Sequence, residues 1–266
     1  MPESSECRLT AEFLNEYLQN TCITEWRFIA GKYTESYPDG YEEFIDGLPL
    51  IVEGVYCKGK FIYFILFNDN GYFYVMHSLR MTGSWRKLPD YYSTCCVEIH
   101  DKDPLWFRNP RGLATFTFTR NKNVLDDYMN GLGPDILNPD EFTLHIWKKI
   151  INDHKKKNIT SLMMSQNIVS GIGNYQKAES LYHARISPLR KAESLSEEEI
   201  EKLYQGIVLI SRSSYNHGGM SIQDYTDENG IRGNYGPQLK IYGKRDATRT
   251  KTADGRTTYW DSDIQV

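Results

Sequence analysis

Two residues at the start of the chain offer chemistry that few side chains provide. Pro2 is a small second residue that permits removal of Met1, which would leave Pro2 with a free secondary amine. An α-amino group titrates near about 8, against about 10.4 for lysine, so far more of it is unprotonated and nucleophilic at neutral pH. Attack on an electrophilic carbon would leave an iminium, and the adjacent Glu3 could act as general acid and base. A proline at this position by chance has a background frequency of roughly 5%.

The most informative stretch covers residues 166–189, QNIVSGIGNYQKAESLYHARISPL. Here a tight turn containing Gly171, Gly173 and Asn174 leads directly into an amphipathic helix that opens at Tyr175. Glycines let the backbone approach a ligand closely, and the unpaired amides at a helix start attract an anion. The turn is therefore predicted to bind phosphate. The alternative is a turn between two helices whose glycines serve packing.

Charge is distributed unevenly along the chain. The formal net charge is −4, and positions 1–53 hold eleven acidic against three basic residues. Positions 240–256 instead hold six basic residues, among them Arg256, against two acidic ones. A basic segment suits contact with phosphates, although a merely solvated loop would have the same composition.

Composition bounds the class of protein. With 266 residues, 40% hydrophobic and 25% charged, the chain can bury a sizeable core and is as consistent with two domains as with one. It has no apolar run as long as a membrane span and no basic-then-apolar leader, so we expect an intracellular protein without a secretion signal. The five cysteines suit free thiols in a reducing compartment. They are Cys7, Cys22, Cys57, Cys95 and Cys96.

Residue types also bear on metal binding. No cysteine follows Cys96 and no histidine follows His217, which argues against a zinc finger at the C-terminal end. We expect neither a metal nor another cofactor.

The residue pattern predicts an α+β protein, β-rich first and helical second. Thr10 is predicted to cap a first helix. Short aromatic or β-branched runs then predict a sandwich or flattened barrel. The predicted strands lie at 24–30, 50–57, 60–67, 72–79, 94–99 and 114–118. A Gly- and Pro-rich stretch at 130–135 indicates a boundary.

Helical spacing of apolar residues dominates beyond this boundary. The predicted helices lie at 142–153, 159–164, 175–184 and 196–215. The last opens with a capping box from Ser196 to Glu199. The chain is expected to end in a hairpin that pairs 240–242 with 257–260.

These features together resemble one family. The string Val169-x-Gly171-Ile172-Gly173-Asn174-Tyr175 resembles the helix-two-turn-helix element of the Fpg/Nei family. These formamidopyrimidine-DNA glycosylases and endonuclease VIII enzymes excise oxidised bases from DNA. The family requires a proline at position 2, which Pro2 provides. The resemblance implies a catalytic β-sandwich domain with a flanking helix, a linker, a helix-two-turn-helix DNA-binding domain and a finger hairpin. Their expected bounds are 1–124, 125–140, 141–236 and 237–266.

By this resemblance, Pro2 is the nucleophile that attacks C1′ of a damaged nucleotide, and Glu3 is the second catalytic residue. Lys60 resembles the lysine that binds phosphates beside the lesion and assists β-elimination, with Lys58 as the alternative. The DNA-binding turn would consist of Gly171, Gly173 and Asn174.

Two loops resemble those that fill the space left by an extruded nucleotide. In the first, Met81 resembles a wedge, and its alternative is a core residue at the end of a strand. In the second, Arg111 resembles the arginine that faces the orphaned base, and Leu113 stands where an aromatic residue is common. Both loops depart from the family pattern, since Arg80 replaces the usual glycine in the first and Ala114 replaces a glycine in the second.

The end of the chain resembles a finger that lacks its metal. Family members typically end in a zinc-held hairpin whose arginine binds the phosphate beside the lesion. Segments 241–244 and 255–260 match the two ends of that hairpin, but its cysteines are absent. The pattern resembles the zincless finger of Nei-like enzymes of animals and giant DNA viruses. Arg256 would then bind the phosphate and assist δ-elimination.

We therefore predict a bifunctional DNA glycosylase and AP lyase of base excision repair that works through a Pro2 Schiff base with β,δ-elimination. Nei-like members favour oxidised pyrimidines and ring-opened or hydantoin purines, and part of the pocket is expected within 218–235. The expected partner is damaged DNA, as duplex, single strand or bubble; no membrane is expected, and the protein is expected to be a monomer. One alternative is a protein that binds damaged DNA or abasic sites without turnover. Another is an AP lyase with weak glycosylase activity on single-stranded DNA.

Overall fold

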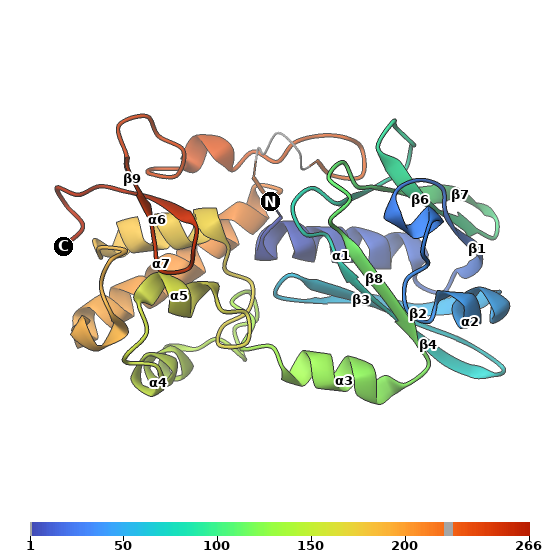
Figure 1. The fold of residues 1–266 in the computed structure, drawn as a ribbon, viewed down its shortest axis with the longest axis horizontal. Helices are drawn as coiled ribbons and strands as arrows, with labels where there is room; N and C mark the ends of the chain where they lie inside the picture. The colour runs from blue at the N-terminus through green and yellow to red at the C-terminus, as the bar shows by residue number, and fades with distance from the viewer. Residues whose placement is uncertain (1, 221–225) are drawn as a thin grey trace.

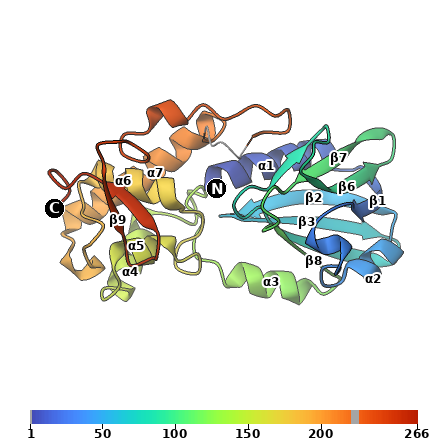
Figure 2. The ribbon, with the colours of Figure 1, turned by 45° about the horizontal axis from the view of Figure 1, so that its top comes forward.

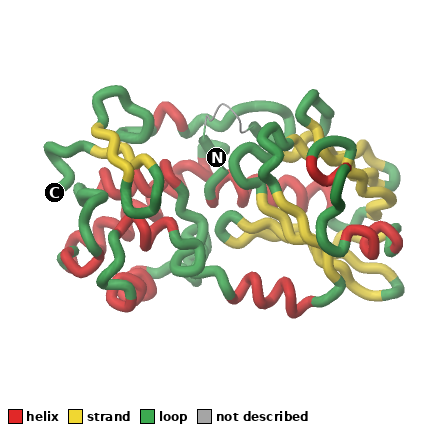
Figure 3. The backbone as a smooth tube through the Cα atoms, in the orientation of Figure 1, coloured by secondary structure: helices red, strands yellow, loops and turns green. Residues whose placement is uncertain are grey.

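The computed structural model describes residues 2–220 and 226–266. Most strands gather in one half of the molecule and most helices in the other (Figures 1 and 3). The first helix, α1 (Ser4–Leu18), begins between the halves and runs along the sheet (Figure 1). None of the described helices is both long and apolar enough to cross a lipid bilayer.

One antiparallel sheet of eight strands, in the order β5-β7-β6-β1-β2-β3-β4-β8, forms the first half. Its strands are β1 (Cys22–Phe28), β2 (Leu50–Lys58), β3 (Phe61–Asn68), β4 (Gly71–Ser78), β5 (Ser84–Arg86), β6 (Ser93–Ile99), β7 (Lys102–Arg108) and β8 (Thr115–Thr119). Six of these eight strands, all except β5 and β7, were predicted from the sequence. β5 was missed because it has only three residues, and β7 was missed because Pro104 and its flanking charges interrupt a strand pattern.

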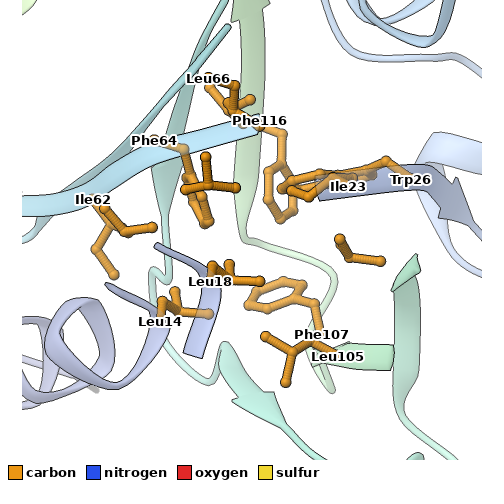
Figure 4. Close-up of a cluster of buried hydrophobic side chains, with 14 of the residues drawn as sticks. Leu14, Leu18, Ile23, Trp26, Ile62, Phe64, Leu66, Leu105, Phe107 and Phe116 are labelled. Atoms are coloured by element: carbon orange, nitrogen blue, oxygen red, sulfur yellow. The ribbon is translucent and has the colours of Figure 1, made fainter. Parts of the chain in front are cut away.

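The sheet folds over on itself around an aromatic core. The Trp26 ring in β1 lies 5.7 Å from Phe64, 5.8 Å from Trp85 and 6.0 Å from Phe116, all nearly perpendicular to it. Edge-to-face contacts between aromatic rings stabilise the fold by more than the burial of their surface area alone provides. Trp85 and Phe116 come from the two edge strands, so both ends of the sheet meet at one core, into which α1 inserts Leu14 and Leu18 (Figure 4). The predicted β-sandwich region is confirmed.

The second half has its own apolar core, built by four helices around residues such as Trp147, Leu181 and Leu203. The helices are α4 (Leu144–Asp153), α5 (Ile159–Met164), α6 (Asn174–Ala184) and α7 (Glu197–Asn216). The capping box of Ser196 and Glu199 at the start of α7 is present as predicted. Shorter elements complete the fold: η1 (Lys32–Thr34), α2 (Tyr41–Asp46), η2 (Ala192–Ser194) and η3 (Gly236–Gln238).

The structure corrects the predicted start of the first helix. Thr10 does not cap it; its hydroxyl donates to the Glu6 carbonyl inside α1 at 2.8 Å. The N-cap is Glu3, because the polar residues between Glu3 and Thr10 are buried against the second half and extend the helix towards it. Sequence periodicity alone placed the start where the apolar stripe becomes regular.

The terminal hairpin exists, but one of its strands was placed wrongly. β9 (Thr248–Lys251) pairs with β10 (Thr257–Trp260), and the hairpin lies across α6 (Figure 2). The segment 240–242 is not a strand, because its three backbone amides donate to the Glu179 carboxylate of α6 at 2.7–2.9 Å. The predicted linker, 125–140, is partly helical, because its first residues, 125–130, form the end of α3 (Lys122–Asn130).

Candidate active site

A pocket of about 200 Å³ lies where the two halves meet. Pro2, Lys60 and Arg256 all line it, although they are far apart in the sequence. Pro2 is buried just before α1, Lys60 immediately precedes β3, and Arg256 lies in the turn between β9 and β10. The fold thus brings a potential nucleophile and two cationic side chains to one cavity.

Glu3 lies beside this pocket, anchored in the second half. Its two carboxylate oxygens accept hydrogen bonds from the backbone amides of Tyr175 at 3.0 Å and Gln176 at 3.2 Å, in the first turn of α6. Gly173 makes room for it, since a Cβ there would lie 2.0 Å from the Glu3 carboxyl carbon. The Glu3 amide in turn donates to the Glu6 carboxylate at 2.7 Å.

This arrangement adds a second role to the glycine turn, whose binding of phosphate stays a prediction. The first amides of α6 attract an anion, as the helix dipole dictates, and in the protein by itself this anion is the Glu3 side chain. The absent side chain of Gly173 leaves room for that carboxylate. Gly171 has φ +107°, and its carbonyl accepts from the Ser4 amide at 3.2 Å, so it too receives the N-terminal segment.

Burial sets the electrostatics of the site. It raises the pKa of Glu3 to about 7; the Lys60 ammonium opposes this shift and the Glu6 carboxylate adds to it. Burial likewise lowers the pKa of Lys60, with Glu3 opposing. A carboxyl group with a pKa near neutrality is suited to gaining and losing a proton during a reaction.

Lys60 is held between the halves. Its ammonium donates to the Ile172 carbonyl at 2.7 Å, and the Gln166 side-chain amide donates to the same oxygen at 3.1 Å. Gly59, at φ +58°, precedes it where a Cβ would lie 2.7 Å from Ser170, so the β2–β3 turn can approach the glycine turn closely. Lys58 instead pairs with Glu141 at 3.0 Å. Of the two lysines, only Lys60 lines the pocket.

Asn174 connects α6 to the hairpin. Its side-chain amide donates to the Thr257 carbonyl in β10 at 3.0 Å, and the residue is partly exposed. It does not line the pocket of Pro2, but its contact places the hairpin, and with it Arg256, next to the start of α6.

The predicted wedge residues lie on two loops of the sheet half, outside the lining of this pocket. Met81 is partly exposed in the turn between β4 and β5 and belongs to none of the apolar clusters of the described residues. Arg111 and Leu113 are exposed in the β7–β8 loop, with Leu113 at 49%. The structure therefore does not gather these three residues around Pro2.

The pocket lining also contains polar residues to which sequence reasoning assigned no site role, among them Ser78, Arg80 and Gln166. Arg80 has φ +54° in the β4–β5 turn and had been noted only as a departure from a glycine pattern. Its basic type beside the neighbouring Met81 was the available signal. Of the segment 218–235, residues 221–225 lie outside the described part of the chain, while the Met220 amide donates to Glu6 at 2.8 Å.

Comparison with known proteins extends this picture. The formamidopyrimidine-DNA glycosylase N-terminal domain matches residues 1–116, and the H2TH domain of the same proteins matches 132–226. A formamidopyrimidine-DNA glycosylase of Desulfitobacterium hafniense is 30% identical over 92% of this chain and 89% of its own. One of Prochlorococcus marinus is 29% identical over the full length of both chains.

The chain belongs to the formamidopyrimidine-DNA glycosylase family. It is accordingly a DNA N-glycosylase and AP lyase of base excision repair with an H2TH DNA-binding domain. The fold is also shared: a Lactococcus lactis FPG variant, solved in complex with Fapy-dG-containing DNA, superimposes with a TM-score of 0.84 at 24% identity over 99% of both chains. In the described parts of this glycosylase, no group of three or more His, Cys, Asp or Glu side chains is arranged to hold a metal ion.

Proposed function

We propose that this glycosylase uses the Pro2 amine as its nucleophile, with Glu3 as proton donor and acceptor and with Lys60 and Arg256 as phosphate ligands. The observation that carries the proposal is the shared pocket of Pro2, Lys60 and Arg256, with Glu3 buried beside it at a pKa of about 7. Removal of Met1 is required, because only then is the proline nitrogen an amine.

The chemistry follows from these four groups. The Pro2 nitrogen bonds to C1′ as the glycosidic bond breaks, and the departing base takes the bonding pair and a proton. Opening of the sugar ring leaves an iminium between Pro2 and C1′. Loss of a C2′ proton then expels the 3′ phosphate, and loss of a C4′ proton expels the 5′ phosphate, which completes β,δ-elimination. Glu3 moves protons in these steps, while Lys60 and Arg256 stabilise the charge on the departing phosphates.

We propose oxidised pyrimidines and ring-opened or hydantoin purines as the substrates, in duplex DNA. The relatives' name and the Fapy-dG-containing DNA bound by the Lactococcus protein support the ring-opened purines. Support for a Nei-like, zincless finger comes from the sequence, since no cysteine follows Cys96. Hydrogen bonds from α6 to the hairpin supply attachments that a metal would otherwise provide.

DNA binding is assigned to both halves of a monomer. Asn174, beside Gly171 and Gly173, would contact the backbone through its side chain, because Glu3 occupies the first amides of α6. The exposed loops carrying Met81, Arg111 and Leu113 would fill the space left by the extruded nucleotide. The division at 1–124, 125–140, 141–236 and 237–266 is proposed with the refinement that α3 extends into the linker.

Borohydride trapping tests the nucleophile and the substrate together. Protein whose Met1 removal is verified by mass is incubated with duplexes that carry thymine glycol, Fapy-dG, 8-oxoguanine or an abasic site. We expect covalent adducts and 3′-phosphate ends with the first two lesions, and much less with 8-oxoguanine. The Pro2→Gly variant should trap far less. Undiminished trapping by that variant would contradict the role of Pro2, and equal cleavage of 8-oxoguanine would contradict the substrate class. The same lesions are also tested in single strands, and stronger cleavage there than in the duplexes would favour a lyase with weak glycosylase activity.

A further inference from the structure

A lysine in the first part of α6 is completely buried and pairs with the turn of the hairpin. The Lys177 side chain has no exposed surface, and its ammonium lies 2.7 Å from Oδ2 of Asp254, whose side chain is 3% exposed. For comparison, the Lys202–Glu198 pair on α7 is 53% and 77% exposed. The buried pair therefore joins two segments 77 residues apart in a place that water does not reach.

Because the pair is buried, each of its two charged groups depends on the other for compensation. An ion removed from water is strongly destabilised unless a partner compensates it, so loss of either partner leaves an uncompensated charge. Burial lowers the pKa of Lys177, while Asp254 opposes that shift. The pair thus favours one placement of the hairpin turn on α6 over any displaced one.

Hydrogen bonds transmit this placement to Arg256. Asp254 accepts from the Thr252 hydroxyl at 2.5 Å, and the Thr252 amide donates to the Arg256 carbonyl at 2.9 Å. The Thr252 hydroxyl also contacts that of Thr258 at 2.7 Å, across the base of the turn. The backbone of Arg256 is therefore linked to Asp254 through a single threonine.

The same helix holds the other side of the pocket. The first amides of α6 bind Glu3, next to Pro2, and Lys177 follows one residue after the last of these amides. Displacement of the turn from Lys177 would therefore change the distance between Arg256 and the N-terminal groups. The Asn174–Thr257 hydrogen bond is an independent but uncharged attachment nearby.

We infer that Lys177 and Asp254 are positioning residues for Arg256: their buried ion pair fixes the hairpin turn on α6 so that the Arg256 guanidinium faces the pocket. The inference rests on the phosphate-binding role proposed for Arg256. It assigns to a side-chain pair the task of holding the hairpin against α6, the helix whose first amides bind Glu3.

Hydrogen–deuterium exchange measures the placement directly, whatever Arg256 does. In full-length Lys177→Met and Asp254→Asn proteins, we expect faster exchange of the amides in 250–258, with the protection of β2 and β3 unchanged. Asp254→Asn keeps the side-chain shape and serves if Lys177→Met does not fold. Lys202→Met, which removes an exposed ion pair of another helix, is the matched control and should exchange like the wild type. Unchanged exchange of 250–258 in both variants would overturn the inference.

A double-mutant cycle then tests the link to catalysis. On duplex DNA with an abasic site, Lys177→Met and Arg256→Gln should each lower kcat/KM and the share of δ-elimination product, by up to on the order of 10²-fold for a misplaced group. If Lys177 acts through Arg256, the double variant should be no worse than Arg256→Gln alone. Multiplying effects would assign Lys177 to general stability and overturn the link. An unimpaired Arg256→Gln would instead refute the role of Arg256, while the exchange data would still decide the placement.

Discussion

Lys60 and Arg256 line the same pocket but are supported in different ways. Lys60 follows a turn of an eight-stranded sheet, is half-buried, and donates to the Ile172 carbonyl at 2.7 Å. Arg256 is exposed at the turn of a two-stranded hairpin, which α6 holds through Asn174 and Lys177. The sheet is stabilised by a large apolar core, whereas an isolated hairpin is only marginally stable in water.

This difference predicts how the two sides of the pocket respond to mutation. The position of the Lys60 ammonium should be disturbed only when Lys60 itself is replaced, because the apolar core keeps its surroundings in place. The position of the Arg256 guanidinium should also change when a distant polar contact of the hairpin is removed. The pocket therefore has one side that is held by packing and another whose geometry depends on a few hydrogen bonds and one ion pair.

The largest effect is expected on the side held by packing. Lys60→Met should lower the single-turnover rate of strand cleavage at an abasic site by roughly 10²–10⁴-fold, because it removes the half-buried cation that we propose binds the departing phosphate. Its neighbour Lys58 pairs with Glu141 outside the pocket, so Lys58→Met should change the rate by less than about three-fold. Equal losses in the two variants would show that overall charge, rather than position in the pocket, is what matters.

An intermediate effect is expected where the halves meet, at Glu3. Its folded pKa of about 7 exceeds the ordinary value of 4.5, so the folded state binds a proton more tightly than the unfolded chain. Stability from this group is full below about pH 4.5 and is lost as the pH rises through 7. Glu3→Gln lacks this loss, so its free energy of unfolding should gain about 3 kcal/mol relative to wild type between pH 4.5 and pH 8.

Urea denaturation at a series of pH values measures that difference. The same variant should also lose the inflection near pH 7 in the single-turnover rate. A constant difference in unfolding free energy across this range would mean that Glu3 does not titrate near neutrality.

The smallest effect is expected on the hairpin side. Asn174→Ala removes one uncharged hydrogen bond to Thr257, which contributes on the order of 1 kcal/mol, and with it the uncharged contact to the DNA backbone that we propose for this side chain. We expect exchange in 257–260 to rise about five-fold and affinity for lesion-containing duplex to fall by a similar factor. The salt dependence of binding should not change, because no charge is lost. Asn152→Ala, at an exposed position of α4, is the control and should bind like the wild type.

Much of the fold follows from local patterns. Alternating β-branched and aromatic residues revealed six strands of the sheet, and apolar spacing with the Ser196–Glu199 capping box located α7. Apart from the two missed strands, the failures arose where a distant part of the chain decides local structure. Residues 4–9 are helical because the second half covers them, and 240–242 is not a strand because Glu179 binds its amides.

The sequence by itself determined the chemical groups of this protein: a proline that can become an N-terminal amine, a neighbouring carboxyl group, a glycine turn before a helix, and an arginine in a cysteine-free segment. Residue types and short-range spacing carry that information. Only the tertiary structure decided that the first amides of α6 bind the Glu3 carboxylate, and that Lys177 reaches Asp254. The partners in the first contact are 172 positions apart in the sequence, and those in the second are 77 positions apart. Both contacts therefore depend on how two separately packed cores meet.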